Sequence, residues 1–279
     1  MNSESEMSIN APRFAEMGVP TIRNVNWGGL RTLYIKEVRR FLKVHTQTVW
    51  APAITTLLYL VIFTVALGRS GRIVMGVSLA DFLAPGLIIM GMMTNAFANT
   101  SFSLLVGKIQ GTIVDYLMPP LSTGELLTGL AAGGVTRALF VGLAMWLAML
   151  FWPGVHMLPQ HLWAVIYFGL AGSLMLALMG VLTSIWAEKF DHAAAVTNFV
   201  VAPLALLSGT FYSVDKLAPA FAAISRVNPF HLAISGFRYG FIGVADTPIS
   251  HSAVVLAIID MIFAVACYLL LRSGWKLKS

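Results

Sequence analysis

The stretch that decides the fold is LSGTFYSVDKLAPAFAAISRVNPFHLAISGFRYGFIG, which runs from Leu207 to Gly243. Charged residues interrupt it, and Asn228-Pro229 divides it into two short apolar pieces. Apolar pieces of roughly 10–14 residues are typical of re-entrant or interfacial segments rather than of helices that cross a bilayer. Proline lacks a backbone donor and disfavours helix at the residue before it, which predicts a break at this dipeptide. The sequence therefore predicts a re-entrant hairpin over 211–243, in the outer half of a membrane.

The composition predicts a membrane protein. The chain has 279 residues, of which 58% are hydrophobic and 11% are charged, whereas soluble domains carry about 25% charged residues. The single cysteine, Cys267, excludes a disulfide within the chain and a multi-cysteine metal site, and its apolar setting predicts an inert buried thiol. The formal net charge of +6 need not indicate nucleic acid, because Lys and Arg gather on the cytoplasmic segments of membrane proteins.

Six apolar stretches are close to the roughly 20 residues that cross a bilayer as a helix. The sequence therefore predicts an all-α integral membrane protein with six transmembrane helices, at about 49–67, 82–106, 130–152, 162–186, 193–207 and 254–271. Six crossings place both ends of the chain on one side. Most Lys and Arg residues near the span ends fall on that side, which predicts cytoplasmic termini and a hairpin that faces outward.

The two ends of the chain are polar. Residues 1–26 lack an apolar h-region, which predicts a disordered cytoplasmic tail without a signal peptide. Residues 27–44 have apolar residues near helical spacing with basic residues between them, which predicts an amphipathic helix at the lipid interface. The alternative is a solvated helix that only precedes the first span. The charged residues of this helix include Lys36, Glu37, Arg39 and Arg40, and residues 273–279 are predicted to form a basic cytoplasmic tail.

The segment 107–128 lies between the second and third spans, on the predicted cytoplasmic side. Thr112 can cap a short helix, and Pro119-Pro120 ends it. Ser122 and Glu125 have the spacing of a capping box for the next turn. A short amphipathic helix with a rigid end can act as a lever that docks into a groove of a partner. The alternative is a loop that only connects two helices.

Polar side chains within the predicted spans are candidates for a transport path or for helix packing. Asn95 and Asn99 lie four residues apart on one face of the second span, and Asn198 lies in the fifth. Asp260, in the sixth span, is a functional candidate because a carboxylate within a membrane is costly. It can equally pair with Arg238 or be neutral and hydrogen-bonded. The six histidines lie in different segments without metal-ligand spacing, so no metal site is predicted.

The segment 207–243 also resembles the signature of ABC-2 type permeases, the membrane subunits of ATP-driven exporters. The matching residues are Gly209, Thr210, Phe211, Tyr212, Leu217, Pro219, Asn228, Pro229 and Arg238. The segment 107–128 resembles the coupling helix of the same family at Gly111, Thr112, Asp115, Pro119 and Glu125, with Lys108 and Tyr116 beside them. The likeness is nearest to bacterial permeases of the drug, lipid and nodulation-factor type, and as an ABC-2 transmembrane domain it covers residues 27–272.

The resemblance implies an exporter assembled from several chains. The sequence has no G-x-x-x-x-G-K-[ST] phosphate cradle, so this chain is predicted to hold no cofactor and to have no ATPase activity of its own. The family implies two copies of a separate ATPase subunit, which bind ATP and Mg, and a homodimer of the permease in the bacterial inner membrane. The predicted cargo is amphipathic, lipid-linked or drug-like. The alternative is a proton-coupled secondary transporter that uses Asp260 and Arg238.

Overall fold

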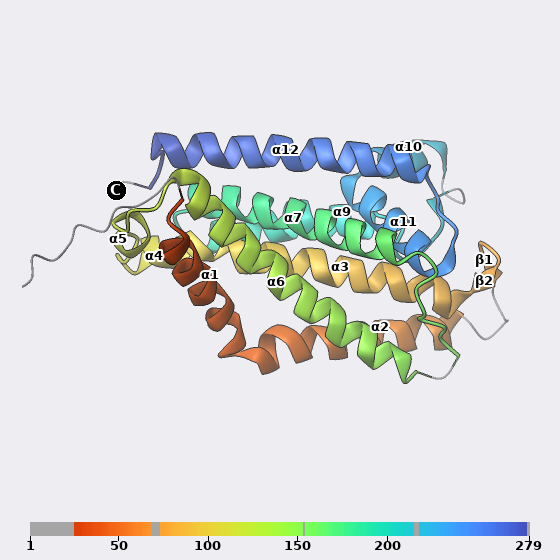
Figure 1. Ribbon diagram of the computed structural model, residues 1–279. Coiled ribbons are helices and arrows are strands. Elements are labelled where there is room, and N and C mark those ends of the chain that lie inside the picture. Colours follow the sequence, from red (N-terminus) through yellow and green to blue (C-terminus); the bar gives the residue numbers. More distant parts are fainter. Residues whose placement is uncertain (1–24, 68–72, 153, 215–217, 278–279) are drawn as a thin grey trace, which may run out of the picture.

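The computed structural model describes residues 25–67, 73–152, 154–214 and 218–277. Apart from one short β-ribbon, the regular elements of these residues are helices (Figure 1). The α-helices are α1 (Trp27–Leu42), α2 (Ala51–Leu67), α3 (Leu79–Ser101), α4 (Ser103–Ile109), α5 (Val114–Leu117), α6 (Thr123–Leu150), α7 (Leu162–Trp186), α8 (Phe190–Val196), α9 (Ala202–Leu206), α10 (Pro219–Val227), α11 (Pro229–Ile242) and α12 (Ile249–Ser273). The other elements are the π-helices η1 (Thr46–Trp50) and η2 (Thr197–Val201) and the strands β1 (Ile73–Val74) and β2 (Val77–Ser78).

Five helical stretches of the described residues are long and apolar enough to cross a membrane. They are Thr46–Val65, Leu79–Ile109, Thr123–Leu150, Leu162–Trp186 and Ile249–Ser273. The prediction of an all-α membrane protein is thereby confirmed. The predicted fifth span, 193–207, is instead part of a shorter apolar helix, Phe190–Leu206, which η2 interrupts. The described residues therefore contain five helices long enough to cross a membrane and one shorter apolar helix, and a sixth crossing stays a prediction.

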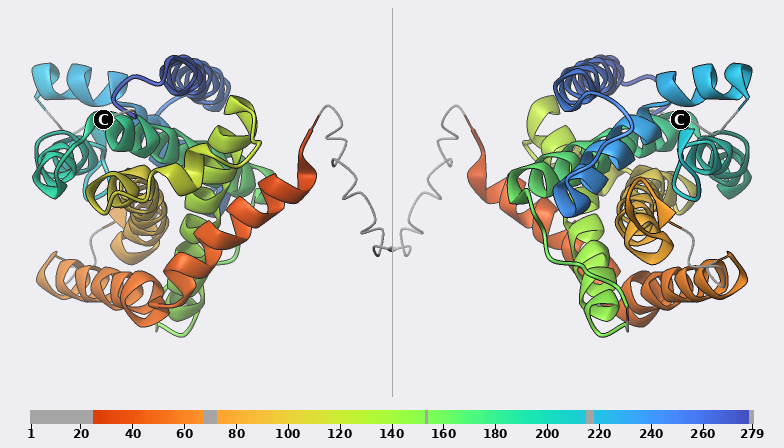
Figure 2. Two further views of the ribbon diagram at one scale, coloured as in Figure 1. Left: turned by 90° about the vertical axis from the view of Figure 1, so that its left-hand side faces the viewer. Right: turned by 90° about the vertical axis from the view of Figure 1, so that its right-hand side faces the viewer.

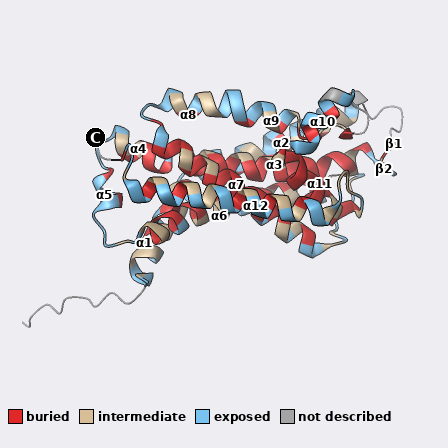
Figure 3. Cartoon of the chain, turned by 90° about the horizontal axis from the view of Figure 1, so that it is seen from above, coloured by how far each residue is buried: buried red, intermediate tan, exposed pale blue. Residues whose placement is uncertain are grey.

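The centre of the bundle is α3, which packs against α6, α7 and α11. Its residues from Phe82 to Met93 are almost all buried. Close packing depends on small residues, since a Cβ atom at Gly180 of α7 would lie 2.8 Å from the carbonyl oxygen of Phe97. Such contacts matter in lipid, where there is no hydrophobic drive between helices. By contrast, α12 buries only a minor share of its residues, and Figure 3 shows exposed positions recurring along it.

The two ends of the bundle differ in character (Figure 1). The end that we call the α5 end holds the start of α1, α5 and the C-terminal end of α12. The opposite end, which we call the α11 end, holds the β-ribbon, α10 and α11. The end-on views in Figure 2 show α1 lying obliquely across the bundle rather than along it. Both ends of the described chain thus lie at the same end of the bundle.

The predicted break at Asn228-Pro229 is confirmed. α10 ends at Val227 and α11 begins at Pro229. The Asn228 side chain accepts a hydrogen bond from the N–H of Phe230 at 3.0 Å, and its Nδ2 donates to the carbonyl oxygen of Leu204 at 2.7 Å. α11 is buried along nearly its whole length, mainly against α3, α7 and α12. The depth of this hairpin in a membrane stays a prediction.

The described ends of the chain pack against the bundle. Residues 1–24 of the predicted N-terminal tail lie outside the described residues, but Asn26 caps α1 by accepting a hydrogen bond from the N–H of Gly29. In the predicted C-terminal tail, Lys276 pairs with Glu188 at 2.7 Å and Leu277 is buried. Residues 278–279 lie outside the described residues. Asn26 and Lys276, which were predicted to lie in the two tails, therefore contact other parts of the chain.

Candidate functional site

The predicted coupling segment, 107–128, is divided among three helices. Gly111 follows α4 in the left-handed conformation, with a φ of 72°. α5 is a single turn whose N-cap residue is Ile113, without a side-chain hydrogen bond. The prediction that Thr112 caps this helix is therefore wrong. The backbone of Thr112 instead belongs to the turn after α4, where its N–H donates to the carbonyl oxygen of Gly107 at 2.8 Å.

The capping box at Ser122 and Glu125 is confirmed, but it begins the long helix α6 rather than a separate turn. The N–H of Ser122 donates to Glu125 Oε2 at 2.7 Å, and the N–H of Glu125 donates to Ser122 Oγ at 3.3 Å. The other oxygen, Oε1, accepts the N–H of Asn26 at 2.5 Å. One carboxylate thus satisfies backbone donors at the starts of both α1 and α6.

Lys108 and Tyr116 face the bundle rather than its surroundings. Lys108 Nζ donates to the carbonyl oxygens of Ile185 at 2.6 Å and Ala187 at 2.8 Å. These carbonyls lie at the C-terminal end of α7, where no helical N–H remains to bind them. Tyr116 is buried, and its hydroxyl donates to Glu37 Oε1 at 3.2 Å. Both residues therefore fix the coupling segment to the other helices of the same chain.

A buried polar cluster joins α1, α5 and the region between α3 and α4. We call it the Glu37 cluster, and its members are Glu37, Arg40, Ser103 and Tyr116. Glu37 is fully buried and pairs with Arg40 at 2.9 Å. Ser103 Oγ donates to Glu37 at 2.9 Å, and Arg40 also donates to the carbonyl oxygen of Asn99 at 2.6 Å. Charged and neutral donors around the carboxylate offset the cost of taking its charge out of water.

The link between Tyr116 and α1 combines two kinds of contact. Burial, together with the negative charge of Glu37, raises the pKa of the Tyr116 hydroxyl above its ordinary value. The hydroxyl therefore stays protonated at neutral pH and remains a hydrogen-bond donor. Lys36 Nζ lies 3.5 Å from the centre of the Tyr116 ring, which is a cation–π contact. The single turn of α5 is thus held to α1 at both the ring and the hydroxyl.

The burial of Glu37 was not predicted. The buried residues of α1 are Leu33, Glu37 and Phe41, which are four residues apart and form one stripe along the helix. α6 receives this stripe at glycines. A Cβ atom at Gly133 would lie 2.6 Å from Glu37 Cβ, and one at Gly129 would lie 2.6 Å from a methyl carbon of Leu33. The α1 helix therefore packs directly on α6 with a carboxylate in the contact.

An exposed face remains on the other side of the coupling segment. Asp115 and Pro119 are exposed, as are Lys36 and Arg39 on α1, and Met118 is 78% exposed. The predicted coupling residues therefore fall into two sets. The anchoring set makes side-chain hydrogen bonds to other parts of the chain and consists of Lys108, Tyr116 and Glu125. The exposed set consists of Gly111, Thr112, Asp115 and Pro119.

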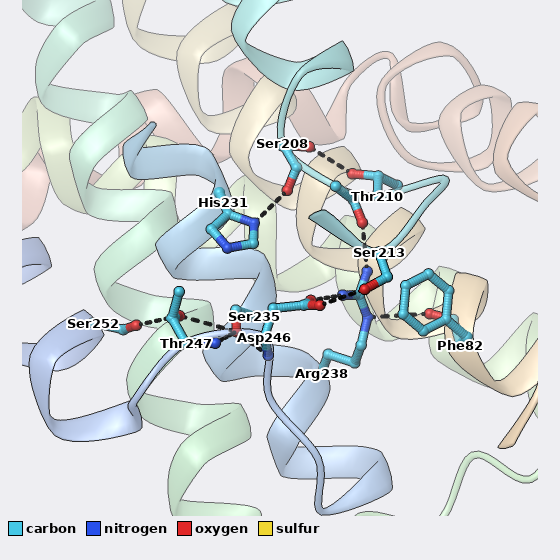
Figure 4. Close-up of polar contacts among 11 residues, drawn as sticks. Phe82, Ser208, Thr210, Ser213, His231, Ser235, Arg238, Asp246, Thr247 and Ser252 are labelled. Carbon is cyan, nitrogen blue, oxygen red and sulfur yellow. Dashed lines mark hydrogen bonds and ion pairs between the residues drawn. The ribbon is translucent and has the colours of Figure 1, made fainter. Parts of the chain in front are cut away.

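At the α11 end, a buried network surrounds Arg238 (Figure 4). Arg238 is fully buried, and its Nη1 donates to Asp246 Oδ2 at 2.7 Å. Its Nη2 donates to the carbonyl oxygen of Gly209 at 2.9 Å, and its Nε to that of Phe82 at 3.3 Å. The guanidinium also lies 3.8 Å from the centre of the Phe82 ring. Since every guanidinium nitrogen has an acceptor here, the alternative in which Arg238 pairs with Asp260 is wrong.

Asp246 was missed because it follows the predicted hairpin. Gly243 ends α11 in the left-handed conformation, with a φ of 70°, and turns the chain back toward Arg238. Asp246 Oδ1 accepts a hydrogen bond from Ser213 Oγ at 3.1 Å, and the N–H of Asp246 donates to Ser235 Oγ at 3.0 Å. The signal in the sequence was a glycine at the end of a helix, followed three residues later by a carboxylate.

The turn before α10 contains further signature residues. Gly209 has a φ of 76°, a backbone conformation that favours glycine. The neighbouring carbonyl oxygen of Ser208 lies 3.0 Å from His231 Nδ1 on α11, as Figure 4 shows. The ring of Phe211 packs against Phe63 of α2, with centroids 4.7 Å apart. These contacts hold the turn between α2 and α11.

The remaining signature residues are local to their helices. The Tyr212 hydroxyl donates to the carbonyl oxygen of Leu206 at 3.2 Å. Pro219 and Pro229 are the first residues of α10 and α11, a position where the missing N–H costs nothing. Leu217 lies outside the described residues.

The asparagines of the predicted spans have different surroundings. Asn95 Oδ1 accepts a hydrogen bond from Arg137 of α6 at 2.9 Å, and Asn95 Nδ2 donates to the carbonyl oxygen of Gly91. Asn95 therefore joins α3 to α6. Asn99 Nδ2 is buried without a hydrogen-bond partner among the described residues. Asn198 is exposed, and its role in a transport path or in helix packing stays a prediction.

Asp260 lies about three turns after the start of α12. Its exposed fraction is 9%, and within the described part of the chain its Oδ1 atom has no hydrogen-bond partner. An ion pair with Arg238 therefore does not offset the cost of burying the Asp260 carboxylate, because Arg238 pairs with Asp246.

Comparisons with known proteins identify a family and several relatives. Residues 29–242 match the model of the family described as ABC-2 type transporter. A relative named inner membrane transport permease YadH, from Escherichia coli strain K12, is 35% identical over 254 residues, which cover 91% of this chain and 98% of the relative. Nodulation protein J from Rhizobium leguminosarum bv. viciae is 28% identical over 262 residues, which cover 92% of this chain and 98% of the relative. The matched range runs from within α1 to the end of α11 and includes the residues of the Glu37 cluster.

Proposed function

The chain belongs to the ABC-2 type transporter family, and on that premise we propose that it exports its cargo outward with energy from a separate ATPase. As a transporter subunit of the inner membrane it needs an energy source, and its sequence has no phosphate cradle. Two ATPase subunits bind ATP and Mg and act on two copies of this chain. The two copies form a homodimer with the transport path between them.

The observation that carries this proposal is that the coupling segment has an exposed side and a side that is bound to the bundle. Its exposed set and Met118 are free to meet a partner, while Lys108 and Tyr116 hold its other side to the bundle. Closure of the ATPase pair on ATP pushes the exposed side. The Glu37 cluster passes this push to α1 and to the junction of α3 and α4, because those elements share its hydrogen bonds.

The proposed orientation places the α5 end in the cytoplasm. Both described ends of the chain lie there (Figure 1), together with the basic residues of α1. A single cysteine in place of Val227, which is 81% exposed, tests the orientation after Cys267 has been changed to Ala. An impermeant thiol reagent should label it from outside intact cells. Labelling only after the inner face is opened would reverse the orientation.

The proposed cargo is amphipathic, lipid-linked or drug-like. The long helices carry few charges, and the outer surfaces of α2 and α12 are apolar. Apolar surfaces of this kind suit a molecule with a large apolar part better than a small ion, because ions need compensating polar groups. A competition series of amphiphiles in transport assays would rank cargo classes.

A proton-coupled secondary transporter is the second candidate, and Asp260 is the observation that favours it. Intramembrane carboxylates of this kind serve proton relays in other transporters. The ion pair between Arg238 and Asp246 weakens this candidate, since one of its two proposed groups is engaged elsewhere. Transport that persists without ATP and collapses with the proton gradient would select it.

The first experiment is purification of the chain from its native membrane, with mass spectrometry and an ATPase assay. We expect a co-purifying P-loop subunit and vanadate-sensitive activity. Met118→Glu should reduce the amount of that subunit at least several-fold. The matched control is Leu158→Glu, because Leu158 is 76% exposed and lies in the loop between α6 and α7. Equal co-purification with both variants would reject the docking face, and an ATPase-free wild-type preparation would reject the ATP-driven exporter.

A further inference from the structure

An apolar cavity of about 660 Å³ lies between α6, α7 and α12. These three helices pack against one another, and α12 lies along one side of the bundle (Figure 1). The volume falls in the range of roughly 300–1,000 Å³ that is usual for small-molecule sites. Its wall is made almost wholly of Leu, Ala, Val and Met side chains, and the polar members are Thr128, Tyr167 and Asp260. The cavity is separate from both the Glu37 cluster and the Arg238 network.

Asp260 gives this cavity its chemical character. It is the one charged side chain among the fourteen described residues that line the cavity, and none of the others is Lys, Arg or His. More than nine-tenths of the residue is buried, and its Oδ1 atom has no hydrogen-bond partner among the described residues. A buried carboxylate without donors is costly, and a cation that enters the cavity would offset that cost.

The neighbouring polar groups do not supply that charge. The Tyr167 hydroxyl, which lines the same cavity, donates to the carbonyl oxygen of Ala253 at 2.8 Å. Arg137 of α6 is not among the residues that line the cavity, and it donates to Asn95 of α3. The cavity therefore presents an unpaired acceptor at the side of an apolar space.

We propose that this cavity binds an amphiphile with a cationic head, held by Asp260, and an alkyl or aromatic body. The apolar wall accepts the body, and an ammonium group pairs with the carboxylate. The mouth includes Met261, which is 66% exposed, and Leu170, which is 40% exposed. A molecule dissolved in the membrane can therefore enter from the side of the bundle. Binding here requires neither ATP nor a partner subunit.

The test uses the full chain in detergent, without ATP. Two photoreactive probes carry a diazirine in the same alkyl chain, one ending in trimethylammonium and the other in a hydroxyl group. Mass spectrometry locates the labelled peptides. Peptides of α6, α7 and α12 should be labelled about fivefold or more in favour of the cationic probe. Asp260→Asn should abolish that preference, while Glu188→Gln, a change of an exposed carboxylate, should preserve it.

A second variant tests the proposal independently if Asp260→Asn does not fold. Ala257 is an exposed residue that lines the cavity, so Ala257→Trp should fill the cavity and remove labelling by both probes there. Equal labelling by the two probes, a preference that survives Asp260→Asn, or labelling that survives Ala257→Trp would each overturn the proposal. A cavity covered by the second copy of the chain would show no labelling in the wild type, which would overturn it too. None of these results would affect the co-purification of an ATPase, so the two proposals fail separately.

Discussion

Each end of the bundle buries an ion pair, and the two pairs differ in what surrounds them. At the α11 end, the side chains of Arg238 and Asp246 are 0% and 1% exposed. At the α5 end, Glu37 is 0% exposed but Arg40 is 33% exposed. Loss of one partner from a fully buried pair leaves an uncompensated charge in the protein, whereas a half-exposed partner can turn to water. The α11 end is therefore the more rigidly fixed of the two.

The elements that the two pairs connect also indicate that the α11 end is held more firmly than the α5 end. Arg238 joins α11 to the start of α3 and to the turn at Gly209 through backbone carbonyls. The Glu37 cluster joins α1 to α5, which is a single helical turn. Asn99 Nδ2, at the edge of this cluster, has no hydrogen-bond partner among the described residues. A movement that starts at one end of this molecule therefore starts more easily at the α5 end.

The largest expected effect comes from Arg238→Met. It leaves Asp246 buried without its cation, so the free energy of unfolding should fall by about 3–5 kcal/mol. Thermal unfolding followed by tryptophan fluorescence in detergent measures the change. The control is Arg272→Met, since Arg272 is exposed on α12. The double variant Arg238→Met with Asp246→Leu should recover part of the loss, and equal losses for Arg238→Met and Arg272→Met would contradict the comparison.

Glu37→Gln should have the next largest effect. The amide cannot serve all the donors that the carboxylate accepts, namely Arg40, Ser103 and Tyr116. We expect a loss of about 1–3 kcal/mol, smaller than at the α11 end because Arg40 can be hydrated again. The control is Asp191→Asn, which changes an exposed carboxylate. A loss as large as that of Arg238→Met would mean that the two ends are equally fixed.

The parts of the structure that depend on local chemistry were predictable from the sequence. The break at Asn228-Pro229 and the capping box at Ser122 and Glu125 each follow from residues within four positions of one another. The interruption of the short helix Phe190–Leu206 by η2 was not predicted, since π-turns have no simple residue signature.

The two ion pairs could not be predicted in full, although their partners are only three and eight residues apart, because their burial depends on packing against other helices. Glu37 is buried because Gly133 of α6 leaves room for it. The sequence of α1 alone does not specify how α1 aligns with α6. Asp246 reaches Arg238 because Gly243 reverses the chain. The family likeness indicated Arg238, but the sequence left two alternatives for Asp260, a pair with Arg238 or a neutral, hydrogen-bonded carboxyl, and it did not indicate Asp246.

Tyr116→Phe should have a smaller effect, and it depends on pH. It removes one hydrogen bond to Glu37 and keeps the ring beneath Lys36, so a loss of about 0.5–1.5 kcal/mol is expected near neutral pH. The pKa of Tyr116 is raised in the folded chain, mainly by burial. Its contribution is therefore complete below the unfolded value of about 10 and falls as the pH rises above it.

The measurement for Tyr116 is the difference in unfolding temperature between the wild type and Tyr116→Phe across the pH range. That difference should be constant at neutral pH and should shrink above about pH 10. The control is Tyr268→Phe, on the largely exposed helix α12. A difference that stays constant into the alkaline range would show that the hydroxyl does not contribute through its protonated form.

The smallest effect is expected at the exposed pair of Glu188 and Lys276, whose side chains are 57% and 34% exposed. Glu188→Gln should change the unfolding temperature only slightly, because exposed pairs are hydrated and screened. The hydrogen bond from Lys276 lowers the pKa of Glu188, so the small contribution is present above the unfolded pKa and disappears as the pH falls through the folded one.

Added salt should distinguish the three ion pairs, since screening acts on exposed charges and much less on buried ones. The effect of Glu188→Gln should vanish in high salt, that of Glu37→Gln should weaken, and that of Arg238→Met should persist. An equal salt dependence for all three would mean that burial does not distinguish the two ends of the bundle.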